Sequence, residues 1–93
     1  FKDFVLYQNY PNPFNSSTII KFKISKPSFV RMTLFNSSGK EVTVILNQYI
    51  LPGEYEEVFN AGKLQSGVYF YKMDLFDPDN KYFSETKKLL IIK

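Results

Sequence analysis

Hydrophobic and polar residues alternate along most of this 93-residue chain, and short segments without this alternation separate one alternating stretch from the next. Between residues 18 and 24, Ile20, Phe22 and Ile24 fall on one side of an extended chain, and two lysines fall on the other. Successive side chains of a β-strand point to opposite faces. The pattern therefore predicts a strand whose apolar face is buried and whose charged face meets solvent.

The same alternation predicts further short strands along the chain. They are expected at residues 4–7, 29–35, 42–46, 54–60, 68–76 and 81–92, with inward positions at Val30, Met32, Leu34, Val42, Val44, Leu46, Tyr55, Phe59, Tyr69, Tyr71, Met73 and Leu75. Residues typical of turns separate these segments, and no segment of the length of a helix shows the helical period. About seven short strands in this arrangement predict an all-β fold, a single antiparallel Ig-like β-sandwich.

The carboxyl-terminal third of the chain carries the strongest pattern. Two runs rich in aromatic and β-branched residues flank the turn Asp77-Pro78-Asp79-Asn80, which predicts an antiparallel hairpin. The second run ends on four consecutive apolar residues, Leu89 to Ile92, followed by Lys93. A chain terminus usually frays, but an apolar run of this kind needs burial. We therefore expect the terminal strand to be an integral part of the sheet.

A stiff loop is predicted near the beginning of the chain, at Tyr10-Pro11-Asn12-Pro13-Phe14. The two prolines fix φ at their own positions and favour extended geometry at Tyr10 and Asn12. We expect a non-helical structural corner, with the rings of Tyr10 and Phe14 folded back on the core.

Length and composition set the scale of the fold. The chain supports one domain, and because it has no cysteine its core must hold the fold without disulfides. Ten Phe and seven Tyr side chains supply that core. The net charge of +3 is expected to be spread over a mixed, solvated surface, and a basic patch for an anionic partner is the alternative. No apolar run reaches the roughly 18–20 residues needed to cross a bilayer.

The residue types argue against catalysis. Without His or Cys, the chain has no imidazole or thiolate for nucleophilic catalysis or for a transition-metal site. The adjacent carboxylates of Glu56 and Glu57 would point to opposite faces of a strand, so they could not flank one scissile bond. We therefore expect no enzyme activity and no cofactor. Because the aromatic residues fall mostly on inward positions, nucleic-acid binding is not expected either.

Three acidic residues, Asp74, Asp77 and Asp79, lie at or near the predicted hairpin turn. Carboxylate oxygens are ligands for Ca²⁺, yet Asp, Pro and Asn are also the residues that turns favour. The glycine and the distal glutamate of an EF-hand loop are missing. Turn formation is the preferred interpretation, and the sequence leaves calcium binding open.

Several segments, in order along the chain, resemble a known family. They are Tyr7–Asn15, Ser38–Val42, Gly53–Tyr55, Leu64–Tyr71 and Lys87–Lys93. The set is similar to the C-terminal sorting domain of the type IX secretion system, in the type A form found on secreted proteins of Bacteroidetes and related phyla. Ser16 departs from the family pattern, since proline is common after Asn15. The resemblance covers residues 6–93 and leaves residues 1–5 as the end of an upstream linker.

The resemblance implies that the domain is an address and not a catalyst. Such domains follow a cargo protein that reaches the periplasm by a separate N-terminal signal, and the outer-membrane translocon recognises the folded sandwich. A sortase-like cysteine peptidase then cuts upstream of the domain, and the cargo is anchored at the cell surface or released outside the cell. We therefore expect a cargo domain before Phe1, with the translocon and the peptidase as partners.

The family also implies which residues take part in export. Its Gly-Val-Tyr segment and its lysine-rich terminal segment correspond here to Gly67, Val68, Tyr69, Lys87, Lys88 and Lys93. A purely structural role is the alternative for Gly67 as a turn residue and for Tyr69 as a core residue.

Two other functions stay open at this point. One is a non-catalytic binding module for carbohydrate or another surface, which would show an exposed row of aromatic rings on one sheet face. The other is an Ig-like structural spacer appended to a larger secreted protein, in which nothing recognises the end of the chain.

Overall fold

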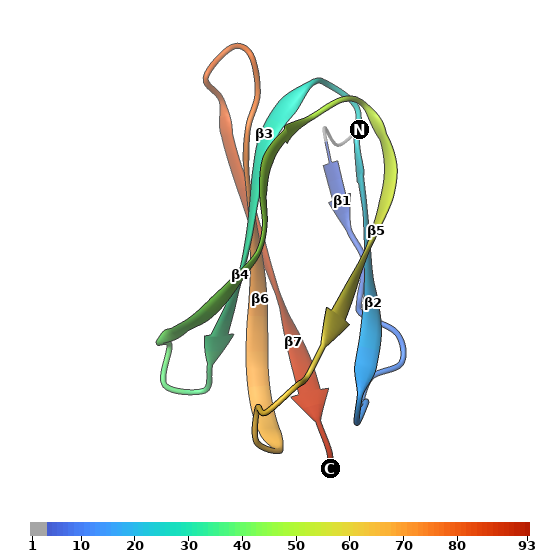
Figure 1. Cartoon of the computed structure of the whole chain (residues 1–93). Coiled ribbons are helices and arrows are strands. Elements are labelled where there is room, and N and C mark those ends of the chain that lie inside the picture. The colour runs from blue at the N-terminus through green and yellow to red at the C-terminus, as the bar shows by residue number, and fades with distance from the viewer. Residues whose placement is uncertain (1–3) are drawn as a thin grey trace.

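The computed structural model describes residues 4–93, and within this range the regular elements are seven strands (Figure 1). They are β1 (Phe4–Leu6), β2 (Ser17–Ile24), β3 (Ser28–Asn36), β4 (Glu41–Ile50), β5 (Gly53–Asn60), β6 (Gly67–Phe76) and β7 (Tyr82–Ile91). A search of this part of the chain finds no helix of the length and apolarity that a membrane span requires. The predicted all-β fold is confirmed.

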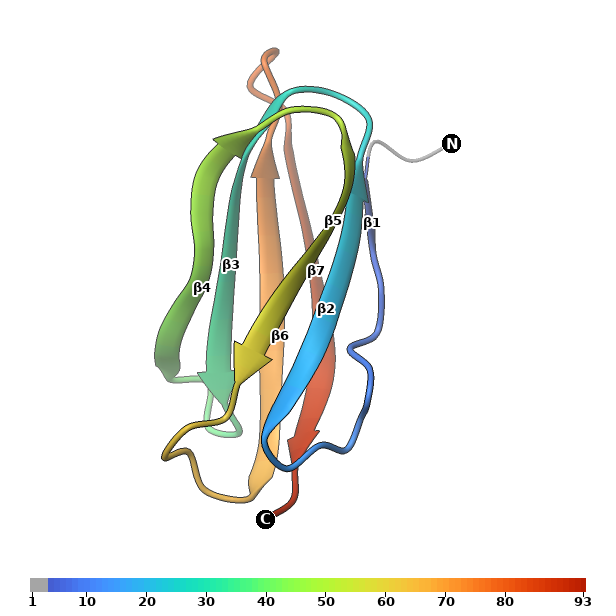
Figure 2. The ribbon, with the colours of Figure 1, turned by 45° about the vertical axis from the view of Figure 1, so that its right-hand side comes forward.

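The strands form two antiparallel sheets that face each other (Figure 2). One sheet has the order β1-β2-β5, and the other has the order β4-β3-β6-β7. The molecule is elongated, with principal extents of 41 × 23 × 21 Å. The β6–β7 hairpin turn and the β2–β3 and β4–β5 connections lie at one end of the sandwich, and the chain ends at the opposite end (Figures 1 and 2).

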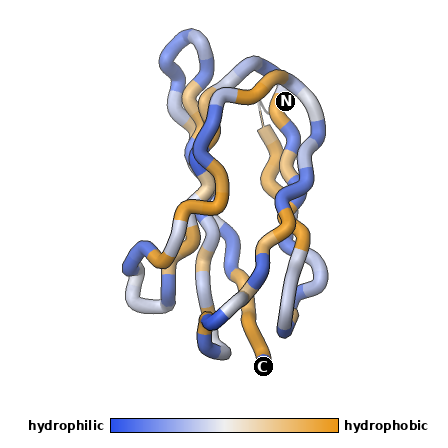
Figure 3. The backbone as a smooth tube through the Cα atoms, in the orientation of Figure 1, coloured by the Kyte–Doolittle hydropathy of each residue, from blue (hydrophilic) through white to orange (hydrophobic). Residues whose placement is uncertain are grey.

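Burial follows the alternation of the sequence because each sheet turns one face to the other. In β2, every second residue from Thr18 to Ile24 is buried, while the residues between them are exposed. The hydropathy of the chain shows the same division, with the terminal segment apolar and the tip of the β6–β7 hairpin polar (Figure 3). The apolar core comprises Phe4, Leu6, Phe14, Ile20, Phe22, Ile24, Val30, Met32, Leu34, Ile50, Phe59, Ala61, Tyr69, Tyr71, Met73, Leu75, Leu89 and Ile91.

The structure corrects the prediction for residues 42–46. Val44 was expected to face inward, but it pairs with Thr33 and lies exposed on the outer face of the sheet. The register between β3 and β4 shifts twice, and the first shift leaves Ile45 as an extra residue between Val44 and Leu46. A bulge of this kind reverses the faces of the residues beyond it, which simple alternation cannot anticipate. Three other β4 side chains, those of Val42, Ile45 and Leu46, pack against the core.

Asp77 organises the turn between β6 and β7. Its Oδ1 accepts hydrogen bonds from the backbone N–H groups of Asp79 and Lys81, both at 2.9 Å, and the residue is buried. Asp74 lies on β6 itself, where it accepts a hydrogen bond from the hydroxyl of Tyr82. Asp74 therefore lies on a strand, whereas Asp77 and Asp79 lie in the turn that follows it. A search of residues 4–93 finds no group of three His, Cys, Asp or Glu side chains placed to hold a metal ion.

The first described strand of the sandwich lies where the alternation at residues 4–7 predicts it. Phe4 opens β1, is buried, and packs its ring 5.8 Å from that of Phe83 between centroids. The expected linker boundary after residue 5 remains a prediction, and its first three residues lie outside the described part of the chain.

Candidate functional site at the carboxyl-terminal end

The two segments that the sequence singled out for export lie side by side on adjacent strands. Gly67, Val68 and Tyr69 begin β6, and they pair in register with the last three residues of β7, Leu89–Ile91. Both Leu89 and Ile91 are completely buried. The expectation that the terminal strand is integral to the sheet is therefore confirmed.

The loop between β1 and β2 covers the outer edge of the terminal strand. At residue 90, the backbone N–H donates to Asn12 Oδ1 at 2.9 Å and the carbonyl oxygen accepts from the N–H of Phe14 at 3.1 Å. Ile92 N–H donates to the carbonyl of Phe14 at 2.9 Å, and Gln8 Nε2 donates to the carbonyl of Lys88 at 2.6 Å. An edge strand normally leaves such groups unpaired. Here β6 and the loop hold the last strand from both sides.

A buried polar network fixes that loop to the core. The hydroxyl of Tyr71 accepts a hydrogen bond from the N–H of Asn9 and donates one to the carbonyl of Tyr7, both at 2.8 Å. Asn9 Nδ2 donates to Thr18 Oγ1 at 3.0 Å and to the carbonyl of Pro11 at 3.2 Å. Desolvation raises the pKa of the Tyr71 phenol to about 12, since an ionised oxygen would be buried there.

The loop itself matches its prediction in part. Phe14 folds back on the core, as expected, and meets Phe59 edge to face with 6.4 Å between ring centroids. Tyr10 was expected to do the same, but its side chain is 80% exposed. Its backbone pairs with Ile19 through two hydrogen bonds of 3.0 Å, and this pairing leaves the ring on the outside of the sheet. The peptide bonds that precede Pro11 and Pro13 are both cis.

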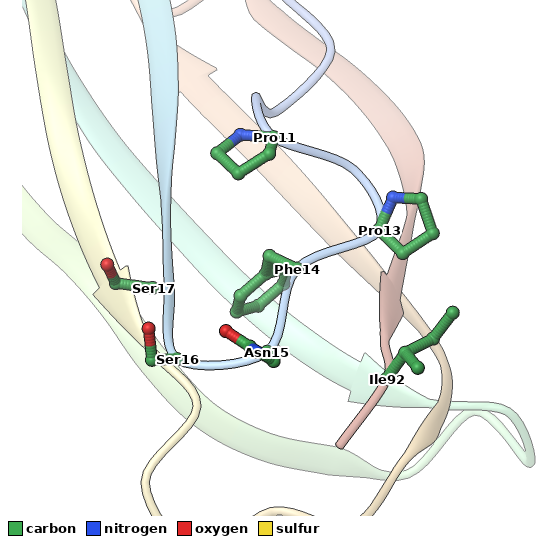
Figure 4. A pocket seen from close by; sticks show the side chains of 7 residues that line it. All are labelled: Pro11, Pro13, Phe14, Asn15, Ser16, Ser17 and Ile92. Atoms are coloured by element: carbon green, nitrogen blue, oxygen red, sulfur yellow. The ribbon is translucent and has the colours of Figure 1, made fainter.

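A shallow, open pocket of about 510 Å³ lies where the loop meets the end of the chain (Figure 4). It is lined by Pro11, Pro13, Phe14, Asn15, Ser16, Ser17 and Ile92. The lining combines apolar groups, such as those of Pro13 and Ile92, with the hydroxyl groups of the serines and the amide of Asn15. Ile92, which follows β7, is 57% exposed, in contrast to the buried residue before it.

The three lysines named from the sequence point in different directions. Lys87 pairs with Glu85 on the same strand, with 3.4 Å between Nζ and Oε2. Lys88 is exposed on the outer face of the sheet, opposite Phe70. Lys93 donates from Nζ to the carbonyl of Gly62 at 2.7 Å and from its N–H to Ser66 Oγ at 2.8 Å. They surround the terminal strand without forming one cluster.

Gly67 and Tyr69 have a clear structural role. Gly67 has φ +157°, a backbone conformation that other residues rarely adopt, and the hydroxyl of Tyr69 donates to the carbonyl of Gln65 at 2.8 Å. The same arrangement occurs before β5, where Gly53 has φ +153° and the hydroxyl of Tyr55 donates to the carbonyl of Leu51 at 2.6 Å. The Gly-x-Tyr pattern thus closes the loop before a strand at two places.

Sequence reasoning named Asn12 only as part of the stiff loop, and it assigned no role to the other polar residues that hold the terminus in place. Gln8, Asn9 and Asn12 bond the loop to β7 and β6, and Ser66 accepts from the last residue. All four lie in segments that resemble the family, but their partners lie 27 to 80 residues away, so no local pattern indicates these hydrogen bonds.

Comparisons with known proteins bear on the family and on the fold of this chain. The family model described as "Secretion system C-terminal sorting domain" matches residues 8–93. Among solved structures, CopC from Methylosinus trichosporium OB3b is similar in fold, with a TM-score of 0.60 at 15% sequence identity over 95% of this chain and 92% of that chain. The curated protein sequences gave no match.

The family match spans nearly the whole chain and includes both segments that meet at the terminal strand. Such a domain implies a cargo on its N-terminal side and export to the cell surface or the extracellular space. The chain belongs to the family of type IX secretion C-terminal sorting domains.

Proposed function

We propose that this domain directs an attached cargo across the outer membrane, and that the translocon recognises the folded carboxyl-terminal end of the sandwich. The observation that carries the proposal is the double anchoring of β7, by β6 on one edge and by the loop at residues 8–14 on the other. A linear tag would need no such anchoring.

The proposed recognition surface combines three parts of the chain that only the fold brings together. They are the pocket beside Ile92, the loop prolines Pro11 and Pro13 that line it, and the exposed charges of Lys88 and Lys93. Because the surface is rigid before binding, the partner does not have to order a flexible tail, and that lowers the entropic cost of recognition.

The later steps follow the family pattern as part of the proposal. A sortase-like peptidase cuts upstream of the sandwich after passage from the periplasm, and the cargo is anchored or released. The domain takes part as a substrate, not as a catalyst, and it needs no cofactor. The lack of His and Cys in the chain supports this assignment.

A reporter experiment tests the proposal. Residues 1–93 are fused to the carboxyl end of a reporter that carries a periplasmic signal, in a host with the type IX machinery. We expect the reporter at the cell surface or in the medium, and in the periplasm when residues 87–93 are deleted. Secretion that is unchanged by the deletion would contradict the proposal.

Deletion of the last strand removes part of the core, so a second variant has to separate recognition from folding. Lys88→Ala with Lys93→Ala removes two exposed charges and one exposed hydrogen bond, that of Lys93 with Gly62, and leaves Leu89 and Ile91 in place. We expect lower export with unchanged thermal stability. The matched control replaces Lys21 and Lys23, exposed lysines on β2, and should export normally.

A further inference from the structure

Four aromatic side chains form a row across the outer face of the larger sheet. The pairing registers place Tyr49 of β4 beside Phe29 of β3, Phe29 beside Phe76 of β6, and Phe76 beside Tyr82 of β7. Each strand of the sheet contributes one ring, in the order β4-β3-β6-β7. Alternation along single strands turns each ring outward, but only the register between strands aligns them.

The row is exposed and fixed in position. The four side chains are 61%, 40%, 45% and 51% exposed in the order given, although each carries a large aromatic ring. Phe76 and Tyr82 pack with 5.0 Å between ring centroids, and the hydroxyl of Tyr82 donates to Asp74. Three strand spacings make the platform about 14 Å long.

Polar groups run alongside the aromatic row. A second row lies two residues closer to the middle of each strand, on the same outer face. Its members, which also pair in register, are Asn47, Arg31, Asp74 and Ser84. The charges there are paired with neighbours of opposite sign, Arg31 with Glu41 at 3.8 Å and Asp74 with Lys72 at 3.7 Å. These four residues therefore offer hydrogen-bonding groups, and neither charge among them is unpaired, which favours a neutral ligand over an anionic or cationic one.

The exposed area favours a narrow ligand over a protein. With about 200 Å² per aromatic side chain, the exposed fractions amount to about 400 Å² of aromatic surface. A stable protein–protein interface, including one with a second copy of this chain, buries about 800 Å² per partner. The row alone supplies about half of that area.

We propose that the aromatic row of Tyr49, Phe29, Phe76 and Tyr82 is a binding site for a neutral polysaccharide chain. The apolar C–H faces of successive sugar rings would lie on the electron-rich ring faces, and the hydroxyl groups would bond to Asn47, Asp74 and Ser84. Phe76 and Gly67 are the two ends of β6, so the site lies about 30 Å from the terminal recognition surface. Glycan binding and export are therefore separable activities of the domain.

Affinity electrophoresis tests this site with the intact 93-residue chain. Native gels contain hydroxyethyl cellulose, xylan or galactomannan as neutral probes and polygalacturonate as an anionic probe. We expect retardation in at least one neutral gel and none beyond the blank in the anionic gel. Phe29→Ala and Phe76→Ala should each weaken the retardation about tenfold, which corresponds to about 1.4 kcal/mol. Tyr10→Ala is the matched control, since that exposed ring lies elsewhere, and it should bind normally.

Circular dichroism and thermal melting of each variant show whether it is folded. Retardation in no neutral gel, or retardation of the Phe29→Ala and Phe76→Ala variants as strong as that of the wild-type chain, would overturn the glycan assignment. So would concentration-dependent dimerisation of the wild-type chain that Phe76→Ala abolishes, because the row would then be a contact between copies. Loss of export in these variants would assign the row to the translocon instead, while normal export is expected here.

Discussion

The hydroxyl of Tyr71 on β6 lies 2.8 Å from the backbone nitrogen of Asn9, a residue 62 positions away in the sequence. The same oxygen donates to the carbonyl of Tyr7, so one buried phenol satisfies two backbone groups of the amino-terminal loop. That loop carries Asn12 and Phe14, which in turn hold the terminal strand. Tyr71 therefore links the core to the loop that holds the outer edge of the terminal strand.

Replacing Tyr71 with Phe should destabilise the fold and change its response to alkali. The variant leaves the buried N–H of Asn9 unpaired, at a cost of about 1–3 kcal/mol. In the folded protein the pKa of Tyr71 is about 12, above the value of 10.0 for a free phenol. The native state therefore holds this proton more tightly than the unfolded state. The contribution of the protonated phenol to the free energy of unfolding is complete below pH 10 and is lost as pH rises through about 12.

Urea denaturation at a series of pH values measures the difference. Between pH 10 and 12 the stability of the wild-type chain should fall more steeply than that of Tyr71→Phe. All other side chains are the same in the two proteins, so the difference between the two curves isolates Tyr71. Parallel curves for the two proteins would show that the phenol is not protected.

Replacing Asn12 with Ala should remove one hydrogen bond that attaches the terminal strand to the loop, the bond at the backbone amide of Leu90. Asn12 Oδ1 is the acceptor for Leu90 N–H, and its loss should cost about 0.5–1.5 kcal/mol. Amide hydrogen exchange should become faster at Leu90, while the amides in the middle of β6 keep their protection. Asn12→Asp is the control, because it retains an acceptor oxygen and should keep Leu90 protected. Equal exchange at Leu90 in all three proteins would contradict the assigned bond.

Tyr69→Phe and Tyr55→Phe form a matched pair for the export function. Each loses one hydrogen bond from a tyrosine hydroxyl to the carbonyl four residues earlier, so each should cost about 1 kcal/mol. Only Tyr69 closes the loop that contains Ser66, the partner of Lys93. We expect weaker export for Tyr69→Phe than for Tyr55→Phe at equal stability, measured with the reporter fusion. Equal export would leave both residues with a structural role alone.

Truncating Phe14 should expose the end of the chain to proteases. Its ring is buried against Phe59, and Phe→Ala changes in cores cost about 3–5 kcal/mol. Because the backbone of Phe14 bonds to Leu90 and Ile92, we expect early cleavage within β7 during limited proteolysis. Val58→Ala, an exposed apolar change on β5, should leave the cleavage pattern unaltered.

The sequence by itself determined the strands and their buried faces. The apolar inward residues of β2 and all the inward residues of β6 were predicted, because a period of two is a local property of the chain. The terminal run was assigned to a sheet for a similarly local reason, since four consecutive apolar residues need burial. The family resemblance also rested on short segments that can be identified one at a time, and the family match confirms it.

The tertiary structure decided which strands pair, and in which register. The two shifts between β3 and β4 turned Val44 outward, and the pairing of Tyr10 with Ile19 left that ring in solvent. The anchoring of Leu90 by Asn12 and the alignment of Tyr49, Phe29, Phe76 and Tyr82 are likewise results of register. Partners tens of residues apart meet only after the chain has closed its loops, so no local pattern encodes them.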